Sequence, residues 1–509
     1  MNRTKTILIG LDGCDFRILK PLINDGHLPT FSELLENGCH GTLISTLPFN
    51  TLPAWTSIFT GVNPGKHGVT DFNIKENGEF KIANSNYRMV DTLWTILNRF
   101  KLHQIIVNEP VTYPAEKIKG VMLTGFSTPF QSKNFAYPPT IKNEINKVCS
   151  GYQADLPFGF EKIIATDKAK GFELINEFAN KIFKATRYLE KNYEWNLLSV
   201  IFTSTDRLQH FYFSDSKYIR KHYELLDGFI NKIISMEPNA NIITVSDHGF
   251  GPLKKCVYIN TWLKEQKLVV ENRSVLNASL SCFGLTYKKM VSTLEKIKLY
   301  KILARITPMS MKRSIPKYTT DKNIDFNKST IFSPGLNSGL FINETVNNHQ
   351  VSILKEKLSS LVIDTERPIE SIHMKNEVLW GSYAYRAADA FLIPKYGYEI
   401  SHRLVPSYLS PPSTFGDIRT GTHRPTGIFI AYGPDISKGS KLKKPLFTWD
   451  IAPTILHMFN LPIPAYMDGV VLKKTFKEGS EPATRLAKFT YLAERERIVH
   501  RLKMLRRKT

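Results

Sequence analysis

Cysteine is scarce in this sequence and poorly placed for cross-linking. The 509 residues include five cysteines, an odd number, and no two of them have the spacing of a metal-binding or redox motif. They are Cys14, Cys39, Cys149, Cys256 and Cys282. Scattered cysteines of this kind argue against a disulfide framework and favour a reducing compartment.

Long apolar runs are also missing. No uninterrupted hydrophobic stretch approaches the roughly 20 residues that a membrane-spanning helix needs. The apolar run at residues 6–11 is too short for the core of a secretory signal, and Asp12 and Gly13 follow it directly. Together with the cysteine usage, these absences predict a cytoplasmic protein without a transmembrane segment.

Acidic residues are few compared with basic ones. The chain has 46 Asp and Glu residues against 68 Lys and Arg residues, so its formal net charge is +22. Such an excess favours anionic partners, which include phosphate substrates, nucleic acid and acidic membrane surfaces, without selecting among them. No internal repeat or low-complexity segment is present.

What the sequence does contain is an alternation of short apolar runs with helical patterns. Strands are predicted at 6–11, 41–45, 104–108, 121–124, 197–203, 242–246, 339–343 and 428–432, and helices at 94–100, 172–193 and 217–235 and from 450 onwards. The run at 197–203 is almost continuously apolar, as expected for a central strand covered on both faces. This order predicts an α/β protein with a mostly parallel sheet.

The pattern divides the chain into four segments. Residues 1–271 are predicted to form the first part of an α/β core, and 329–480 its second part. Residues 272–328 are basic and helical in character, and we interpret them as an inserted cap. A solvated helical face explains their charge better than a nucleic-acid or membrane patch. Residues 481–509 are predicted to be a basic C-terminal helix or tail.

The segment 49–61 is predicted to be the centre of the functional site. Pro53 is tolerated near a helix start, so a buried helix is expected to begin at Leu52 with Thr51 just ahead of it as the N-cap. There a hydroxyl faces free backbone N–H groups and the positive end of the helix dipole, which stabilise oxyanions. Capping alone is the simpler explanation of an isolated threonine.

Carboxylate and imidazole residues follow three predicted strands and precede a fourth. The residues are Asp12, Asp206 with His210, Asp247 with His248, and His423. Each alone could be a turn or cap residue. Taken together, their placement at strand ends predicts a shared site, because functional residues collect there in doubly wound sheets. Such a thiolate-free set suits zinc, manganese or iron better than calcium.

These motifs resemble the alkaline phosphatase superfamily, and within it the type I phosphodiesterase/nucleotide pyrophosphatase branch. The resemblance spans most of the chain. It lies in Leu11-Asp12-Gly13, Asn50 to Ser57 with Thr60-Gly61, Pro64 to Gly68, Thr205 to His210, Ser246 to Gly249, Gly421-Thr422-His423, Asp450 to Thr454 and Met467-Asp468-Gly469. It implies a three-layer fold with a mostly parallel central sheet and the helical cap as an insertion.

The resemblance also implies a site for two divalent ions, most often zinc, with manganese as an alternative. Asp206, His210 and His423 would hold one ion; Asp12, Asp247, His248 and the Thr51 hydroxyl would hold the other. Thr51 would be the nucleophile and form a phosphothreonine intermediate. His67, although part of the motif, is interpreted as structural.

One position departs from the family pattern. Nucleotide pyrophosphatases of this branch carry asparagine three residues after the nucleophile, where this chain has Ala54 followed by Trp55. Asn50, Arg207 and Arg424 are the predicted replacements for binding the phosphoryl oxygens. This departure weakens the case for a nucleotide substrate more than the case for the predicted chemistry.

The sequence therefore predicts a metal-dependent hydrolase of anionic phosphate esters, with a phosphodiesterase favoured. A phosphomonoesterase, a phosphonate hydrolase or a phosphotransferase on the same two-metal scaffold is an alternative, and so is a sulfatase, against which Thr51 argues. A third class is a non-enzymatic basic protein that binds nucleic acid or an anionic membrane surface through the cap, which a catalytic Thr51 disfavours.

Overall fold

The computed structural model describes residues 5–130, 132–271, 324–335, 339–363 and 365–491. The predicted basic cap therefore lies outside the described residues except for 324–328, and so does the tail from residue 492. No helix in the described ranges has both the length and the apolar character needed to cross a membrane.

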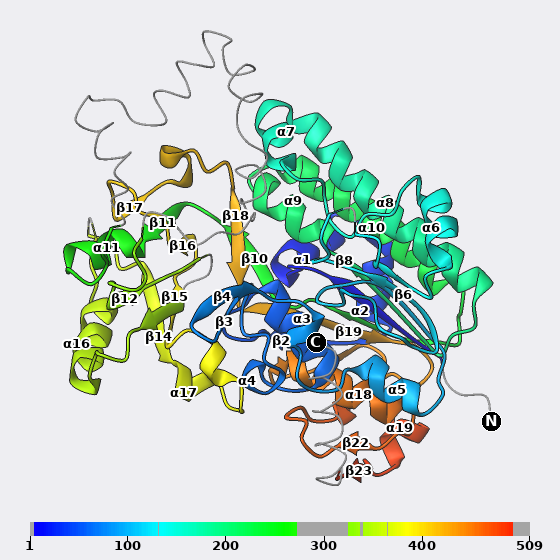
Figure 1. The fold of residues 1–509 in the computed structure, drawn as a ribbon. Helices are drawn as coiled ribbons and strands as arrows, with labels where there is room; N and C mark the ends of the chain where they lie inside the picture. Colours follow the sequence, from blue (N-terminus) through cyan, green and yellow to red (C-terminus); the bar gives the residue numbers. More distant parts are fainter. Residues whose placement is uncertain (1–4, 131, 272–323, 336–338, 364, 492–509) are drawn as a thin grey trace.

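A ten-stranded sheet forms the centre of the described fold (Figure 1). Its order is β20-β2-β19-β9-β1-β8-β5-β6-β7, with β21 also paired to β2. Five neighbouring strands are parallel: β9 (Asn241–Val245), β1 (Thr6–Leu11), β8 (Leu197–Phe202), β5 (Gln104–Glu109) and β6 (Gly120–Thr124). The others are β2 (Cys39–Ile44), β7 (Ala136–Tyr137), β19 (Thr426–Tyr432), β20 (Ser440–Lys441) and β21 (Leu446–Phe447). Strand β19 runs antiparallel to both β9 and β2.

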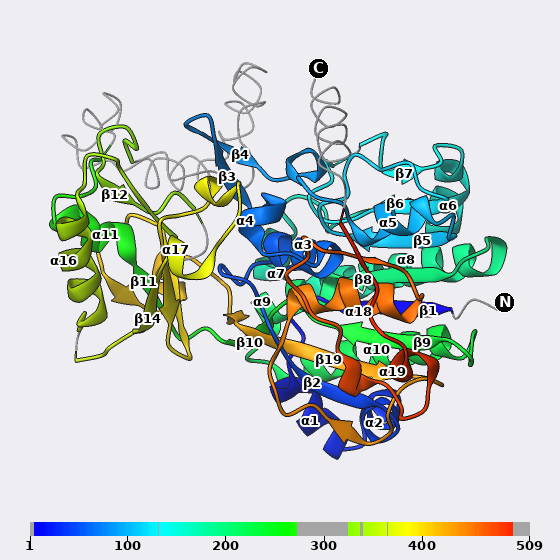
Figure 2. The ribbon, with the colours of Figure 1, turned by 90° about the horizontal axis from the view of Figure 1, so that it is seen from below.

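Helices cover both faces of this sheet (Figures 1 and 2). One face carries α1 (Phe16–Asn24), α2 (Pro29–Glu36), α6 (Ile141–Cys149), α7 (Phe160–Thr166), α8 (Lys168–Asn192), α9 (Ser204–Tyr212) and α10 (Ser216–Ile234). The other carries α3 (Thr51–Thr60), α5 (Leu93–Arg99) and α18 (Ile451–Met458). Along β1, Ile7 and Ile9 enter the first core while Leu8 enters the second, which explains the continuously apolar strands. The predicted three-layer α/β fold is confirmed.

The chain leaves the central sheet after β9 and passes through β10 (Gly249–Pro252), which pairs with β18 (Gly421–Arg424) outside that sheet, into a second lobe (Figure 1). It holds a four-stranded sheet of β12 (Ile331–Phe332), β13 (Gly339–Ile342), β15 (Ala390–Pro394) and β14 (Ile369–Met374). Beside it are β11 (Lys255–Tyr258), β16 (Tyr398–Ser401) and β17 (Leu409–Ser410), with helices α11 (Ile259–Glu265), α16 (Asn348–Ser359) and α17 (Lys375–Val378). The lobe has its own apolar core.

The predicted second part of the core, 329–480, is therefore divided in the structure. Strands β12 to β17 of this segment belong to the lobe, and the chain returns to the central sheet through β18 and β19. Strand periodicity is a local property and does not say which sheet a strand joins. Within the predicted C-terminal segment 481–509, α19 (Glu481–Thr484) is followed by β23 (Phe489–Thr490), which pairs with β22 (Ile463–Pro464).

Two of the sequence motifs far apart in the chain meet at Asp468. Lys66, in the short helix α4 (Pro64–His67), places its Nζ 2.5 Å from Asp468 Oδ1. The Trp380 indole N–H of the lobe donates to the same oxygen at 3.0 Å, and the Asn63 backbone N–H donates to the other oxygen at 2.9 Å. This carboxylate therefore joins the segment after α3, the lobe and the C-terminal part of the core.

Gly10 in β1 is required by close packing. A Cβ atom there would lie 2.1 Å from Ile201 Cδ1 and 2.4 Å from Cη2 of the Trp55 ring. We expect Gly10→Ala to lower the free energy of unfolding by about 1–3 kcal/mol, because neither neighbour has room to retreat. Urea unfolding followed by circular dichroism measures this.

The matched control is Gly228→Ala in α10, where an added Cβ meets nothing within 4 Å. Alanine in a helix costs less backbone entropy than glycine, so this variant should be more stable by roughly 0.5–1 kcal/mol. Equal unfolding free energies for Gly10→Ala and wild type would contradict the packing seen around Gly10.

Candidate metal centre

The predicted carboxylates and imidazoles converge at one edge of the central sheet. Asp12 follows β1, Asp247 and His248 follow β9, and Asp206 and His210 lie one turn apart on α9, directly after β8. His423 comes from β18, which pairs antiparallel with β10 so that His423 lies opposite Phe250. The parallel strands end together here, which brings residues from distant parts of the sequence into one site.

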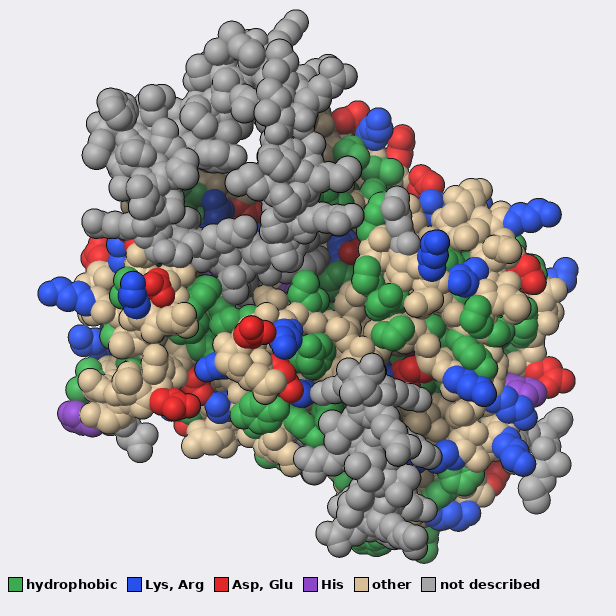
Figure 3. Space-filling model, in the orientation of Figure 1, with side chains coloured by type: hydrophobic (Ala, Val, Ile, Leu, Met, Phe, Trp, Pro, Cys, Tyr) green, Lys and Arg blue, Asp and Glu red, His purple; other side chains and the backbone are tan. Residues whose placement is uncertain are grey.

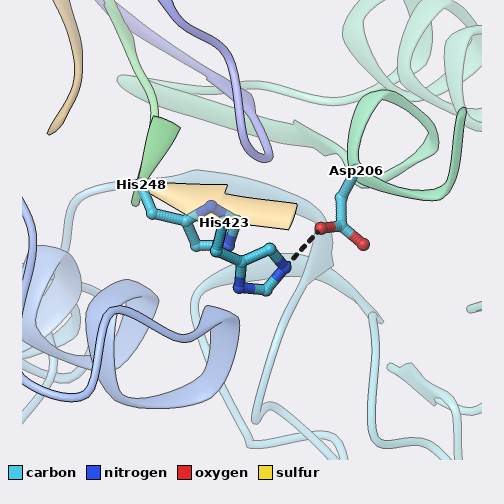
Figure 4. Close-up of side chains that lie close together, drawn as sticks. All are labelled: Asp206, His248 and His423. Carbon is cyan, nitrogen blue, oxygen red and sulfur yellow. Dashed lines mark hydrogen bonds and ion pairs between the residues drawn. The ribbon is translucent and has the colours of Figure 1, made fainter. Parts of the chain in front are cut away.

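One cluster consists of Asp206, His210 and His423. Asp206 Oδ1 is 3.0 Å from His423 Nε2 and 3.3 Å from His210 Nε2, and the two Nε2 atoms are 3.1 Å apart. His248 also belongs here: donor atoms of Asp206, His248 and His423 all lie within 4.8 Å of one another. Figure 4 shows the His423 ring between His248 and Asp206, with its contact to the carboxylate marked.

The second cluster consists of Asp12, Asp247 and His248, with Thr51 beside it. His248 Nε2 is 3.3 Å from Asp247 Oδ2 and 3.5 Å from Asp12 Oδ1. The Thr51 hydroxyl donates to the same Asp12 oxygen at 3.5 Å. The clusters adjoin, because the rings of His248 and His423 stack with centroids 3.8 Å apart.

A contact with a backbone carbonyl oxygen sets the orientation of each imidazole ring. The Nδ1 atoms of the three rings lie 3.1 to 3.3 Å from carbonyl oxygens, His210 at Gly421, His423 at Phe49 and His248 at Gly249. A carbonyl only accepts, so Nδ1 carries the proton in each neutral ring and Nε2 is left as a lone-pair donor. All three Nε2 atoms face the clusters.

One oxygen of each carboxylate accepts a hydrogen bond from a group outside the clusters. The groups that hold these oxygens, which we term outer donors, are the Trp55 indole N–H for Asp12 Oδ2, the Arg207 guanidinium for Asp206 Oδ2 and the Gly13 backbone N–H for Asp247 Oδ1. In every case the other oxygen faces the neighbouring imidazoles. Outer partners of this kind orient the side chains that bind metal ions.

The pKa values show that ionised carboxylates are unfavourable in this buried site without a cation. Burial raises the pKa of Asp12 and Asp247 well above its ordinary value. Nearby negative charge raises it further, from Asp247 and Asp206 at Asp12 and from Asp206 at Asp247. Burial also opposes ionisation of Asp206, but the positive charge and N–H donors that His210 and His423 offer when they are protonated outweigh it, so the pKa of Asp206 lies well below its ordinary value. Burial lowers the pKa of His248 and His423, so both are neutral donors near pH 7.

Two buried atoms of the second cluster suit the binding of a cation. Asp247 Oδ2 and His248 Nε2 are fully buried and have no hydrogen-bond partner among the described residues. An unpaired buried polar atom costs about 1–3 kcal/mol, and a divalent ion between these atoms would remove that cost. The residues present therefore fit divalent metal ions, with carboxylate oxygen and imidazole nitrogen as the donors.

Thr51 occupies a different helix position from the one predicted. Asn50 is the N-cap residue of α3 and Thr51 is the first helical residue. Pro53 falls at the third helical position, where its missing N–H removes no helix hydrogen bond, and the first turn is closed from Ala54 N to Asn50 O. The Thr51 hydroxyl does not cap the helix and contacts Asp12 instead.

The three residues predicted to bind phosphoryl oxygens make contacts to protein groups. Arg207 pairs with Asp206 and Asp155 and lies over the Phe126 ring at 4.4 Å. Arg424 is buried and donates to the carbonyl oxygens of Pro394, Lys395 and Tyr398 in the lobe. Asn50 donates from Nδ2 to Asp71 Oδ1 at 2.9 Å. Their role toward substrate stays a prediction.

Three other residues near the site are Trp55, Asp71 and Asp155. The sequence could have indicated Trp55, because this residue lies four positions after Thr51 and so on the same face of α3. No pattern in the sequence indicated Asp71 or Asp155. His67 lies outside both clusters: it is buried, 3.0 Å from the Ser57 hydroxyl, and accepts from the Val69 N–H.

Asp71 makes stability depend on pH. Burial raises its pKa to about 7, so its contribution to stability is lost as the pH rises from about 4 towards 7. Asp71→Asn keeps the acceptor oxygen and cannot ionise. We expect its stability advantage over wild type to grow by on the order of 1–2 kcal/mol between pH 5 and pH 8. Urea unfolding of the metal-free proteins measures it; an advantage independent of pH would contradict the raised pKa.

Carboxylates, imidazoles and one hydroxyl thus gather at the ends of the parallel strands of an α/β sheet, which is where such folds place their functional sites. Residues 6–407 match the family model described as type I phosphodiesterase / nucleotide pyrophosphatase, and the chain belongs to this family. The predicted family is thus confirmed, and membership makes the protein an enzyme of the phosphoester hydrolase class. Members of the family use divalent metal ions.

A solved structure with a TM-score above 0.5 shares the fold at low sequence identity. Phosphonoacetate hydrolase from Sinorhizobium meliloti 1021, in complex with phosphonoformate, is 14% identical over 90% of this chain and 95% of its own, with a TM-score of 0.58. Murine ectonucleotide pyrophosphatase / phosphodiesterase 5 is 15% identical over the same shares, with a TM-score of 0.49. No curated relative matches the chain significantly in sequence.

Proposed function

We propose that this protein is a metal-dependent phosphodiesterase that acts through a phosphothreonine at Thr51. The observation that carries the proposal is the position of the Thr51 hydroxyl, 3.5 Å from Asp12 Oδ1 at the start of α3 and beside both clusters. The free N–H groups of the first helical turn offer donors to a phosphoryl oxygen at this point.

The chemistry requires an activated hydroxyl and a site for developing charge. Bound divalent ions would lower the pKa of the Thr51 hydroxyl and offset charge on the attacking and leaving oxygens. Thr51 Oγ1 would then form a bond to phosphorus while the ester bond to the leaving alcohol breaks. Water would cleave the Oγ1–phosphorus bond in the second step and restore the threonine.

The charges near the site favour diesters over monoesters. A diester carries one negative charge near pH 7, whereas a monoester carries close to two. Arg207 and Arg424, the arginines predicted to meet the phosphoryl group, are engaged with carboxylates and backbone carbonyls. Asp71 adds a carboxyl behind Asn50. A second substrate charge would therefore meet little compensation from these side chains.

Two divalent ions, zinc or alternatively manganese, are the proposed cofactors. Support comes from two adjoining donor groups, Asp206–His248–His423 and Asp12–Asp247–His248, with His210 close to the first. The set contains no thiolate, and imidazole with carboxylate suits zinc and manganese.

Hydrolysis of bis-p-nitrophenyl phosphate and p-nitrophenyl phosphate by metal-stripped protein, reloaded with zinc or manganese, tests the proposal. We expect metal-restored turnover of the diester that exceeds turnover of the monoester. Turnover of the monoester alone would replace the proposal with a phosphomonoesterase. Transfer of the phosphoryl group to an added alcohol in preference to water would replace it with a phosphotransferase. Failure to bind metal would overturn it altogether.

Nucleic acid or membrane binding through the segment 272–328 receives no support from the described residues. In the view of Figure 3, Lys and Arg side chains are scattered over the described surface with acidic side chains among them. A cytoplasmic location stays a prediction. It is supported by the four cysteines in the described ranges, which are all buried and unpaired.

A further inference from the structure

Trp55 is the one aromatic side chain among the outer donors described above. Its indole N–H donates to Asp12 Oδ2 at 3.4 Å. Residues Thr51 and Trp55 are one helical turn apart on α3, so a single helix presents both the proposed nucleophile and the group that holds its neighbouring carboxylate.

The indole is held rigidly. Trp55 is 0% exposed, and its ring stacks on Phe59 with centroids 5.7 Å apart. The outer edge of the ring packs against β1 where Gly10 has no side chain; a Cβ at Gly10 would lie 2.4 Å from Trp55 Cη2. The N–H direction is therefore set by the packing of α3 against the central sheet.

A fixed donor determines which oxygen of Asp12 faces the clusters. With Oδ2 engaged by Trp55, Oδ1 is the oxygen that lies 3.5 Å from both Thr51 Oγ1 and His248 Nε2. A carboxylate free to rotate would exchange its two oxygens and spend part of its time turned away from the imidazole. Ordering it in advance removes that cost from ligand binding.

We propose that Trp55 is a positioning residue that orients the Asp12 carboxylate and thereby raises the affinity of the ion held by Asp12, Asp247 and His248. This inference rests on the proposed two-metal function. It concerns one of the two ions, because Asp206 is held separately by Arg207.

Calorimetric titration of the metal-stripped full-length protein with zinc tests the inference. Wild type should bind two ions. Trp55→Phe should bind one ion as wild type does and the other about 10–100-fold more weakly, the usual consequence of losing an outer partner of a metal ligand.

Trp94→Phe is the matched control. Trp94 is also buried, also contacts the Phe59 ring, and donates its indole N–H at 3.1 Å to Glu116, outside both clusters. This variant loses the same atoms from the same core and should bind both ions within about twofold of wild type.

A third protein carries β-(3-benzothienyl)alanine at position 55, which keeps the shape of the indole and lacks its N–H. It should reproduce the weakened site of Trp55→Phe even if the phenylalanine variant folds poorly. Two tight sites in this protein, equal to wild type, would overturn the role of Trp55 while leaving the proposed function intact. Absence of zinc binding by wild type would instead overturn the proposed function.

Discussion

Thr51→Ala is expected to abolish diester hydrolysis, with kcat reduced about a thousandfold or more, while the protein still binds metal. The variant removes the only atom that would bond covalently to phosphorus, and residues that act as one catalytic unit lose nearly all of their effect when the nucleophile is removed. Asp12, Asp247 and His248 keep their donor atoms, so metal binding should survive. Steady-state hydrolysis of bis-p-nitrophenyl phosphate by zinc-loaded protein measures the loss.

Two further variants separate chemistry from folding. Thr51→Ser keeps a hydroxyl and should keep part of the activity. Thr60→Ala removes another buried threonine of α3, whose hydroxyl donates only to the Thr56 carbonyl within the helix, and should leave turnover near that of wild type. Mass spectrometry of acid-quenched wild type should find a phosphoryl group on the peptide that contains Thr51. Wild-type turnover by Thr51→Ala would exclude the proposed nucleophile.

Asp247→Asn is expected to reduce turnover by at least about a hundredfold by weakening metal binding. An asparagine still accepts the hydrogen bond from the Gly13 N–H but has no negative charge. Bound metal at a thousand times its dissociation constant stabilises a protein by about 4 kcal/mol. Much of this gain should be missing in the variant, as measured by the shift of the unfolding midpoint on adding zinc.

The same variant should behave oppositely without metal. Burial and the charge of Asp206 raise the pKa of Asp247, so the wild-type fold loses stability as the pH rises above the ordinary aspartate value near 4. Metal-free Asp247→Asn avoids this loss and should be more stable than metal-free wild type at pH 7. The control is Asp227→Asn: Asp227 is buried in α10 and accepts from the Thr30 and Phe31 N–H groups. It should lower stability without changing zinc uptake. An unchanged zinc-dependent shift in Asp247→Asn would exclude Asp247 as a ligand.

Much of the fold was predictable because its central strands are buried on both faces. The apolar runs at 6–11, 197–203 and 242–246 lie next to one another in the sheet, as a mostly parallel α/β arrangement requires. Polar residues directly after such runs meet at one edge, and this argument alone brought Asp12, Asp206 and Asp247 to a common site. The structure places them within reach of one another.

The lobe was not separated from the core by sequence, because its strands have the same short alternating pattern. Only the pairing of β15 with β13 and β14, rather than with the central sheet, divides residues 329–480. The N-cap position was misplaced by one residue, since a proline is tolerated throughout the first turn of a helix and does not mark its beginning.

The sequence by itself determined the chemistry available to this protein: the carboxylates, imidazoles and hydroxyl that suit divalent ions and phosphate esters, and their placement at strand ends. Tertiary structure alone decided the orientation of each group. Trp55 holds one oxygen of Asp12 and Arg207 one oxygen of Asp206, while distant carbonyls turn the histidine rings. These partners are set by how helices pack on the sheet, which depends on contacts between residues far apart in the chain and not on any local pattern.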